Sequence, residues 1–328
     1  LYAVINNCTT AIGRRNLREK LLNPIPDANE LNQRYKYVES LMQRKSNDSY
    51  EYQIYEDSLK KIIDVERLHR RLGLKLLQPS DFGSLDLSYQ YINQMLTHDN
   101  LEINQLKPSN EIIKNFSEFI EEYKRDFDLE EIIKYHFDKI TNSFFNSGIN
   151  VSLDIIQTEI DNSNLVLKAI SRKLSDLIEK GSNFVKIEHN ELRGYHLVCT
   201  TKRSNLLKER FKNMNHCKIK ISLSNEDLML DPKDLSYKFI NSSKSSTMIC
   251  SQLLTKHSNN IICNQVKIQE VCKHAFFERC TYYYTKYEVS LKAITKFVGN
   301  IDLIKSSAKT ALLYGYIRPT IDSNCSDK

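Results

Sequence analysis

Hydrophobic residues recur at intervals of three and four along most of the chain, and this spacing predicts amphipathic helices. The clearest example covers residues 152–180, where leucine and isoleucine repeat at helical spacing and Gly181 follows as a candidate cap. A helix of this length reaches about 43 Å at about 1.5 Å per residue. Similar spacing predicts further helices over residues 9–23, 28–45, 55–77, from Asp81 onward, 250–297 and 301–314.

The hydrophobic period changes in the middle of the chain. Residues 184–188 alternate between apolar and polar, residues 195–199 are short and apolar, and residues 218–223 alternate again. These patterns are typical of β-strands. The simplest arrangement is a long outgoing helix, a small β-rich insertion, and a returning helix antiparallel to the first.

Composition favours the same mainly α fold. The chain has 328 residues, of which only 8 are glycine and 6 are proline, about a third of average usage. We therefore expect a helical core, two long antiparallel lever helices and a small inserted β-rich clamp. The predicted division is a helical core over 1–150, an outgoing lever helix over 151–183, a β-rich clamp over 184–246, a returning lever helix over 247–300 and the end of the core over 301–328.

Several classes of protein are disfavoured by simple counts. No run of about 18 apolar residues occurs, so we expect no membrane partner. The eight cysteines form no C-x-x-C pair, which indicates free thiols rather than a zinc site or a disulfide scaffold. The N-terminus has neither a start methionine nor a signal-peptide pattern, so we expect a piece of a longer protein.

Positive charge is concentrated in one stretch. Between Arg193 and Lys220 there are eight basic residues and one acidic residue, Glu209, so the local balance of +7 exceeds the +6 of the whole chain. Such a concentration indicates contact with a polyanion, and we predict non-specific, salt-sensitive contact with the phosphates of double-stranded DNA. The candidate DNA-binding residues are Thr201, Lys202, Arg203, Lys208, Arg210, Lys212, Lys218, Lys220, Ser243 and Lys244, of which the first three directly follow a predicted strand.

Other charged residues have a structural interpretation. One predicted helix carries a charged group that could suggest acid–base chemistry, but ion pairs three and four residues apart explain it more simply. Its members are Asp64, Glu66, Arg67, Arg70 and Arg71.

No catalytic, metal-binding or cofactor-binding residue is predicted in this chain. The histidines are scattered, although His189 and His196 lie on opposing predicted strands and could be neighbours. The sequence shows no nucleophile–base pair and no glycine-rich phosphate loop.

Four segments, in this order, resemble the MutS family of DNA mismatch-repair proteins. Thr10-Ala-Ile-Gly-Arg-Arg-Asn-Leu is similar to the family's T-x-x-G-x-R-x-L helix, and Asp64-Val-Glu-Arg-Leu to its D-[IL]-E-R helix. Asn190-Glu-Leu-Arg-Gly-Tyr-His-Leu resembles the N-x-x-x-G-Y-Y-[IF] hairpin of the clamp. Ala311-Leu-Leu-Tyr-Gly-Tyr-Ile-Arg-Pro resembles the A-x-x-N-x-[YW]-x-[RC]-P segment before the ATPase. The resemblance implies a core and clamp that encircle DNA, and therefore a location inside the cell, at DNA.

The chain also departs from the family pattern. It has no G-x-x-x-x-G-K-[ST] loop and no mismatch-reading domain with a Phe-x-Glu motif, so this piece is expected neither to hydrolyse ATP nor to select mismatches alone. ATP, Mg²⁺ and a homodimer or heterodimer are expected only for the longer protein. Asn23 and Tyr314 replace family residues, which suggests a divergent branch.

Two alternatives remain open from the sequence. One is a MutS-like meiotic or recombination protein that clamps DNA junctions rather than mismatches. The other is a helical scaffold whose basic tip binds an acidic protein.

Overall fold

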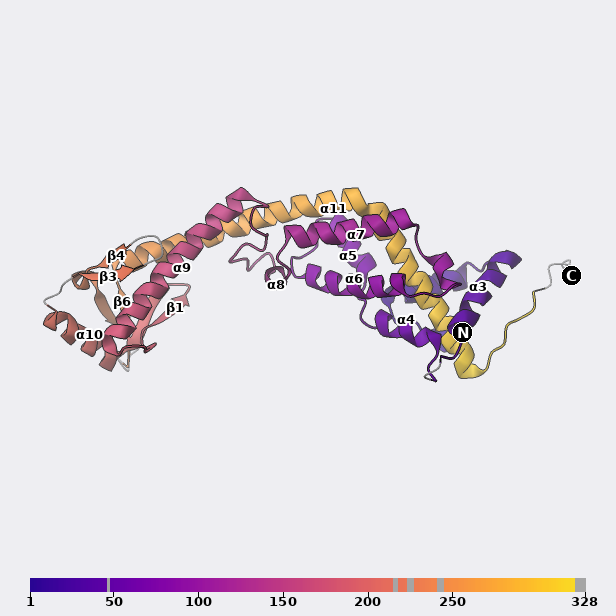
Figure 1. Ribbon diagram of the computed structural model, residues 1–328, viewed down its shortest axis with the longest axis horizontal. Coiled ribbons are helices and arrows are strands. Elements are labelled where there is room, and N and C mark those ends of the chain that lie inside the picture. The colour runs from indigo at the N-terminus through magenta and orange to yellow at the C-terminus, as the bar shows by residue number, and fades with distance from the viewer. Residues whose placement is uncertain (46–47, 215–217, 223–226, 241–244, 322–328) are drawn as a thin grey trace. The chain divides into compact units, whose positions relative to one another are not determined.

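The chain forms two units. The computed structural model describes residues 1–45, 48–214, 218–222, 227–240 and 245–321 (Figure 1). Unit 1 comprises Leu1–Phe137 and Ala275–Lys328, and unit 2 comprises Asp138–His274. The predicted mainly α fold is confirmed, whereas the finer five-part division stays a prediction.

Unit 1 is helical, and several of its helices begin at a side chain that caps them. Thr10, Asp27, Asp64 and Ser109 each accept a hydrogen bond from the backbone N–H three residues later, which satisfies a donor that the helix leaves free. The elements are α1 (Tyr2–Ile5), α2 (Ala11–Leu22), α3 (Ala28–Leu41), α4 (Glu51–Leu59), α5 (Val65–Gly73), α6 (Asp81–Thr97), η1 (Ile103–Leu106), α7 (Asn110–Asp126), α8 (Leu129–Ile132) and residues 275–314 of α11 (Gln252–Tyr314).

Aromatic side chains fill the centre of unit 1. The ring of Phe119 on α7 is fully buried, and its centroid lies 5.2–5.8 Å from the rings of Tyr89, Tyr123, Tyr283 and Tyr287. Tilted and edge-on ring contacts of this kind add to the stabilisation from burial. The cluster therefore joins α6 and α7 to α11.

Two tyrosine hydroxyl groups in this core are satisfied by carboxylates. The Tyr123 hydroxyl donates to Asp86 at 2.6 Å, and the Tyr283 hydroxyl donates to Asp126 at 2.6 Å. A buried hydroxyl without a partner is costly, so these bonds allow tyrosine to be used as a core residue.

A buried carboxylate joins the N-terminal segment to α11. Asp302 is fully buried and accepts hydrogen bonds from the backbone N–H groups of Thr9 and Thr10 at 2.9 and 2.7 Å. Lys305, also fully buried, lies 3.1 Å from the same carboxylate. A Cβ atom at Gly13 would lie 2.2 Å from Asp302 Oδ2, so the close approach requires glycine. Residues almost 300 positions apart are thereby locked together.

Several carboxylates of unit 1 are stabilised in their charged form. A hydrogen bond from Arg15 lowers the pKa of Asp64. Burial opposes ionisation of Glu56, but a hydrogen bond from Lys309 lowers the pKa of its carboxyl overall. Burial also opposes ionisation of Asp86, whose pKa is lowered overall by hydrogen bonds from Lys124 and Tyr123.

These depressed pKa values predict loss of stability in acid. Each group has a lower pKa when folded than when unfolded, so its contribution is complete above the unfolded value and is lost as the pH falls through the folded value. The ordinary values are 4.5 for Glu56 and 3.8 for Asp64 and Asp86. We expect the melting temperature to fall steadily below about pH 4.5. A melting temperature that is constant from pH 6 to pH 3 would contradict this assignment.

Unit 2 combines two helices with two small sheets. The four-stranded antiparallel sheet has the order β1-β2-β6-β5, and β3 pairs with β4 in a separate hairpin. The bounds are α9 (Val151–Ile178), β1 (Lys186–Asn190), β2 (Gly194–Thr200), α10 (Thr201–Asn213), β3 (Ile219–Ser222), β4 (Asp227–Leu230), η2 (Pro232–Asp234), β5 (Ser236–Phe239), β6 (Ser246–Cys250) and residues 252–274 of α11.

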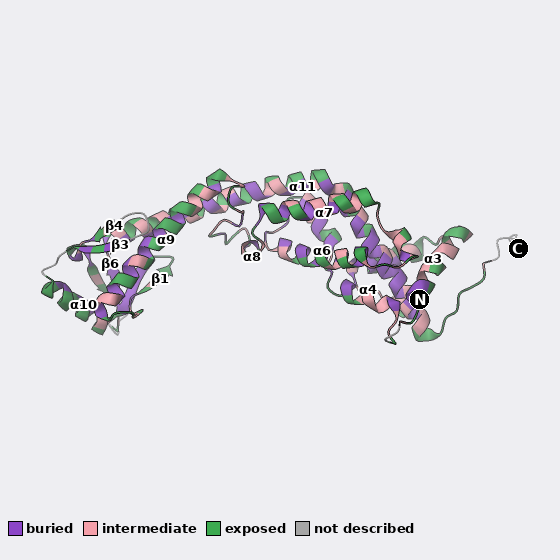
Figure 2. Ribbon diagram, in the orientation of Figure 1, coloured by how far each residue is buried: buried purple, intermediate pink, exposed green. Residues whose placement is uncertain are grey.

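Polar contacts show that α9 and this part of α11 are antiparallel. Asn260 on α11 donates to Ser163 on α9. Asn264 lies four residues further along α11, and it donates to Glu159, which lies four residues further back on α9. Buried positions recur at helical spacing along α9 (Figure 2). The predicted antiparallel helix pair is thus confirmed within unit 2.

Serine side chains fasten the segment that enters the sheet. Ser171 donates to the Val185 carbonyl at 2.6 Å, and the Val185 N–H donates to the Ser175 hydroxyl at 2.9 Å. Ser182 donates to the Ser175 carbonyl. The backbone just before β1 is therefore paired with α9 although it lies outside any strand.

A tight turn joins β1 to β2 against α11. Gly194 has a φ of +65°, a conformation that favours glycine. A Cβ atom here would lie 2.6 Å from the Ser258 hydroxyl, which accepts a hydrogen bond from the backbone N–H of Tyr195. His189 pairs with Tyr195 and His196 pairs with Glu188, so the two histidine side chains lie on opposite faces of the sheet.

The structure corrects three predicted elements. The helices predicted over 250–297 and 301–314 are one continuous helix, α11, and Gly299 within it allows close packing: a Cβ atom there would lie 2.3 Å from Asn16. The helix predicted over 55–77 is two helices, since Asp64 caps a new one. Residues 201–213, placed inside a β-rich clamp, form α10.

Candidate nucleic-acid interface

Helix α10 carries most of the predicted DNA-binding residues and is anchored to the sheet beneath it. The helix starts directly after β2, and its buried side chains are Ser204, Leu207 and Phe211, at helical spacing. The hydroxyl of Thr201 lies 3.1 Å from that of Thr247 on β6. Because one face is fixed to the sheet, the other faces are presented to solvent.

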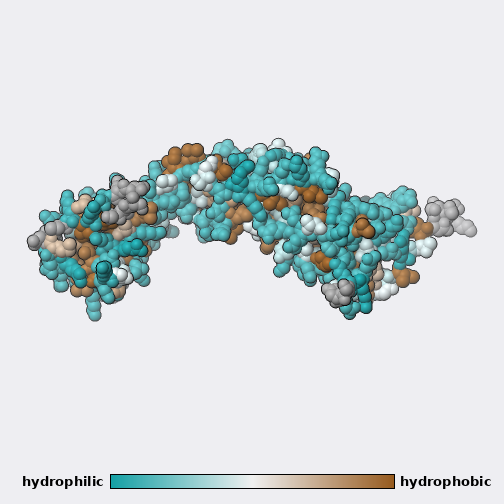
Figure 3. Space-filling view, in the orientation of Figure 1, coloured by the Kyte–Doolittle hydropathy of each residue, from teal (hydrophilic) through white to brown (hydrophobic). Residues whose placement is uncertain are grey.

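The basic side chains of α10 are distributed over the flanks and outer face that the helix presents to solvent. At about 100° per residue, Lys208 and Lys212 lie on one flank of the buried face, while Arg203 and Arg210 lie on the other. Lys202 occupies the outer face. Four of these side chains are exposed and Arg203 is half-buried. The surface of unit 2 drawn in Figure 3 is mostly hydrophilic.

Two of these cations rest on aromatic rings. The guanidinium carbon of Arg203 lies 3.6 Å from the centroid of the Phe184 ring, and the ammonium nitrogen of Lys208 lies 4.7 Å from the centroid of the Tyr237 ring. Both distances are within the range of cation–π attraction. Sequence reasoning missed Phe184 and Tyr237, since no pattern in the chain joins them to residues of α10.

The other candidates differ in how far their charge is matched. Lys202, Arg210 and Lys212 form no ion pair with any residue that the structure describes. Lys220 on β3 forms an ion pair with Asp227 on β4, with 2.6 Å between Nζ and Oδ2.

The remaining candidates lie near the β3–β4 hairpin or outside the described chain. Lys218 precedes β3 and is exposed. Ser243 and Lys244 lie outside the described residues.

A thiol lies close to Arg203 and Lys208. Burial raises the pKa of Cys199 to about 11, although both cations oppose this rise. The thiol is therefore protonated at neutral pH, and a protonated thiol is a poor nucleophile.

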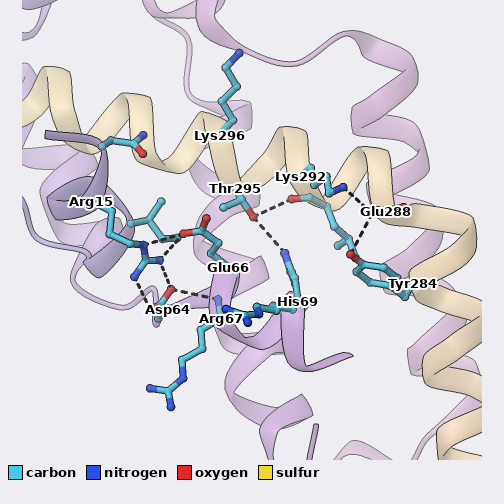
Figure 4. A pocket seen from close by; sticks show the side chains of 14 residues that line it. Arg15, Asp64, Glu66, Arg67, His69, Tyr284, Glu288, Lys292, Thr295 and Lys296 are labelled. Carbon is cyan, nitrogen blue, oxygen red and sulfur yellow. Dashed lines mark hydrogen bonds and ion pairs between the residues drawn. The ribbon is translucent and has the colours of Figure 1, made fainter. Parts of the chain in front are cut away.

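A separate cavity of about 720 Å³ lies in unit 1, and its wall includes Asp64, Glu66, Arg67 and Arg70 of the charged group noted above (Figure 4). Arg15 lies between Asp64 and Glu66 and donates to both carboxylates. The prediction that these charges pair with one another within one helix is therefore wrong. Asp64 and Glu66 pair with Arg15 of α2, and Arg71 pairs with Asp81. A structural role still explains these charges.

The histidine of this cavity is held as a neutral group. Burial lowers the pKa of His69 to about 3. Its two ring nitrogens lie 3.2 Å from the Thr295 hydroxyl and 2.8 Å from the Tyr89 hydroxyl. A ring engaged on both sides has no nitrogen left for a substrate or a metal.

The described part of the chain contains neither a cluster of metal ligands nor a membrane-spanning helix. No group of three or more histidine, cysteine, aspartate or glutamate side chains there is arranged to hold a metal ion. None of the helices described is both long and apolar enough to cross a bilayer.

Comparison with known proteins identifies the family. A family model for MutS domain III matches residues 1–308. The putative DNA mismatch repair mutS homolog of Acanthamoeba polyphaga mimivirus is 30% identical over 98% of this chain and 29% of that protein. The mitochondrial DNA mismatch repair mutS homolog of Sarcophyton glaucum is 24% identical over 98% of the chain and 30% of that protein. The DNA mismatch repair protein MutS of Treponema denticola is 25% identical over 100% of the chain and 32% of that protein.

The chain thus spans about a third of the length of these curated relatives. The part that it spans is domain III, which is not the ATPase domain of the family. The resemblance drawn from four short segments is confirmed by a match that extends over nearly the whole sequence. The chain belongs to the MutS family of DNA mismatch-repair proteins.

Proposed function

We propose that this chain holds double-stranded DNA by its sugar–phosphate backbone, with α10 of unit 2 as the main contact. The observation that carries the proposal is the set of cations on α10: five basic side chains on one 13-residue helix, none of them in an ion pair with a described residue. Unpaired cations fixed on a rigid element suit phosphate contact. Nothing about the arrangement favours the reading of base edges, so the contact is non-specific.

The first turn of α10 is suited to a phosphate for a second reason. A helix N-terminus carries a partial positive charge from its aligned peptide groups, and here the first turn holds Lys202 and Arg203 and no acidic residue. These residues and Thr201 are the leading contacts in the proposal, followed by Lys208, Arg210 and Lys212. Lys218 and Lys220 lie near the β3–β4 hairpin and contribute less, since Asp227 already matches the charge of Lys220.

In the longer protein this contact serves a MutS-type clamp. We expect ATPase activity, with ATP and Mg²⁺, to come from another part of that protein, because this chain contains no G-x-x-x-x-G-K-[ST] loop. We propose that long helices such as α11 transmit the nucleotide state to the DNA contact, and that two subunits, identical or different, close around the duplex. Rigid-body movement of packed elements is a common means of such coupling.

The proposal predicts a characteristic salt dependence. If about five phosphates are neutralised, the logarithm of the association constant should fall with the logarithm of salt concentration with a slope of about −4 to −5. Lys202→Ala should weaken binding equally on duplexes of different sequence and make the slope shallower by about 1. Fluorescence anisotropy with a labelled duplex, measured between 50 and 200 mM salt, gives both quantities.

The control is a lysine outside unit 2. Lys61 is exposed and has no ion-pair partner in the described chain, so Lys61→Ala should change neither affinity nor slope. An unaltered slope for Lys202→Ala would count against the proposal. Binding to polyglutamate but not to DNA would favour an acidic protein partner, and tighter binding to a four-way junction than to a duplex would favour the junction clamp.

A further inference from the structure

The two aromatic contacts beneath α10 hold charge in place without neutralising it. Arg203 stacks on Phe184 at 3.6 Å, and Lys208 lies over Tyr237 at 4.7 Å. Neither cation has a carboxylate partner among the described residues. Each ring therefore restrains a cation that keeps its full charge.

Stacking leaves the donors of a guanidinium group free. The ring covers one face of the planar group, while the N–H bonds lie in its plane and point outward. An ammonium group over a ring likewise keeps N–H bonds directed away from it. An ion pair with a carboxylate, such as that between Lys220 and Asp227, instead occupies the donors that a phosphate needs.

Restraint matters because long side chains lose rotational freedom when they bind. Ordering a flexible lysine or arginine at an interface costs conformational entropy and so weakens binding. Lys202, Arg210 and Lys212 have no such support in the described chain and must be ordered on binding. Arg203 and Lys208 are already partly ordered.

We propose that Phe184 and Tyr237 are positioning residues, which hold Arg203 and Lys208 ready for the phosphates of DNA. The inference rests on the proposed function and extends it to two residues outside α10 that carry no charge. Phe184 immediately precedes the segment fastened by Ser171 and Ser175, and Tyr237 lies on β5, so both rings come from fixed parts of unit 2.

Tyr237 offers a matched control. Its hydroxyl is buried and has no hydrogen-bond partner among the described atoms. Tyr237→Phe therefore keeps the ring and removes only a group that contributes no bond, whereas Tyr237→Leu removes the ring.

The test compares affinity with salt slope in the chain of 328 residues. Phe184→Leu and Tyr237→Leu should each weaken duplex binding about two- to fivefold with no change in slope, because the number of cations is unchanged. Tyr237→Phe should bind as the parent does. Arg203→Ala should lower the affinity and make the salt slope shallower. Thermal denaturation of each variant establishes that it is folded.

The outcomes separate this inference from the proposed function. If the parent chain fails to bind duplex DNA, both are overturned. Suppose that the parent chain binds duplex DNA and that Arg203→Ala weakens this binding. If both leucine variants are folded and bind as tightly as the parent, only the positioning role is overturned. A shallower slope for a leucine variant also overturns it, since that result means that a contact was lost rather than loosened.

Discussion

Asp302→Ala is expected to lower the free energy of unfolding by about 3–5 kcal/mol, the usual effect of removing one partner from a buried ion pair. The substitution leaves the fully buried ammonium group of Lys305 without its nearest carboxylate. It also removes the acceptor for the backbone N–H groups of Thr9 and Thr10. Urea denaturation followed by circular dichroism measures the change.

Asp57→Ala is the matched control for this substitution. Asp57 is 76% exposed in its side chain and pairs with Lys60 on the surface of α4, and an exposed pair of this kind contributes little to stability. An equal effect of the two substitutions would show that the network around Asp302 does not hold the N-terminal segment to α11.

Phe119→Ala is expected to be comparably damaging, at about 3–5 kcal/mol, because it removes a buried ring and leaves a cavity. Four tyrosine rings contact Phe119, and they belong to α6, α7 and α11. Two of their hydroxyl groups are tied to Asp86 and Asp126, so the surrounding side chains have little freedom to fill the space.

The control for Phe119 lies on the outside of α11. Val289 is 72% exposed, and Val289→Ala should alter the free energy of unfolding by no more than about 0.5 kcal/mol. If Phe119→Ala has a similarly small effect, the aromatic cluster is not the centre of the core of unit 1.

Local pattern predicted much of this fold because helices and hairpins are determined by neighbouring residues. The repeat that ends near Gly181 predicted α9 closely, alternation predicted β1 and β3, and a short apolar run predicted β2. Helix α10 was not predicted, although Ser204, Leu207 and Phe211 have helical spacing. Three apolar or small positions among many lysines and arginines give only a weak helical pattern. The continuity of α11 through Gly299 was not predicted, since the close contact of Gly299 with Asn16 depends on a helix remote in sequence.

The candidate interface was only partly predictable. The cationic residues were evident from their density, but the sequence could not show that Asp227 matches Lys220 or that Lys202 is unpaired. Contacts such as that of Arg203 with Phe184 arise between elements that only the folded sheet brings together. For the same reason, Arg15 could not be recognised as the partner of Asp64.

The interruption of unit 1 by unit 2 affects the order of events during protein synthesis. Phe119 leaves the ribosome before the whole of unit 2, whereas Tyr283 and Tyr287 follow it. At about 5–20 residues per second, this delay is on the order of 10 s. Unit 2 can therefore complete its core before unit 1 does. Until α11 is synthesised, the aromatic face of the earlier helices that includes Phe119 stays exposed and accessible to chaperones.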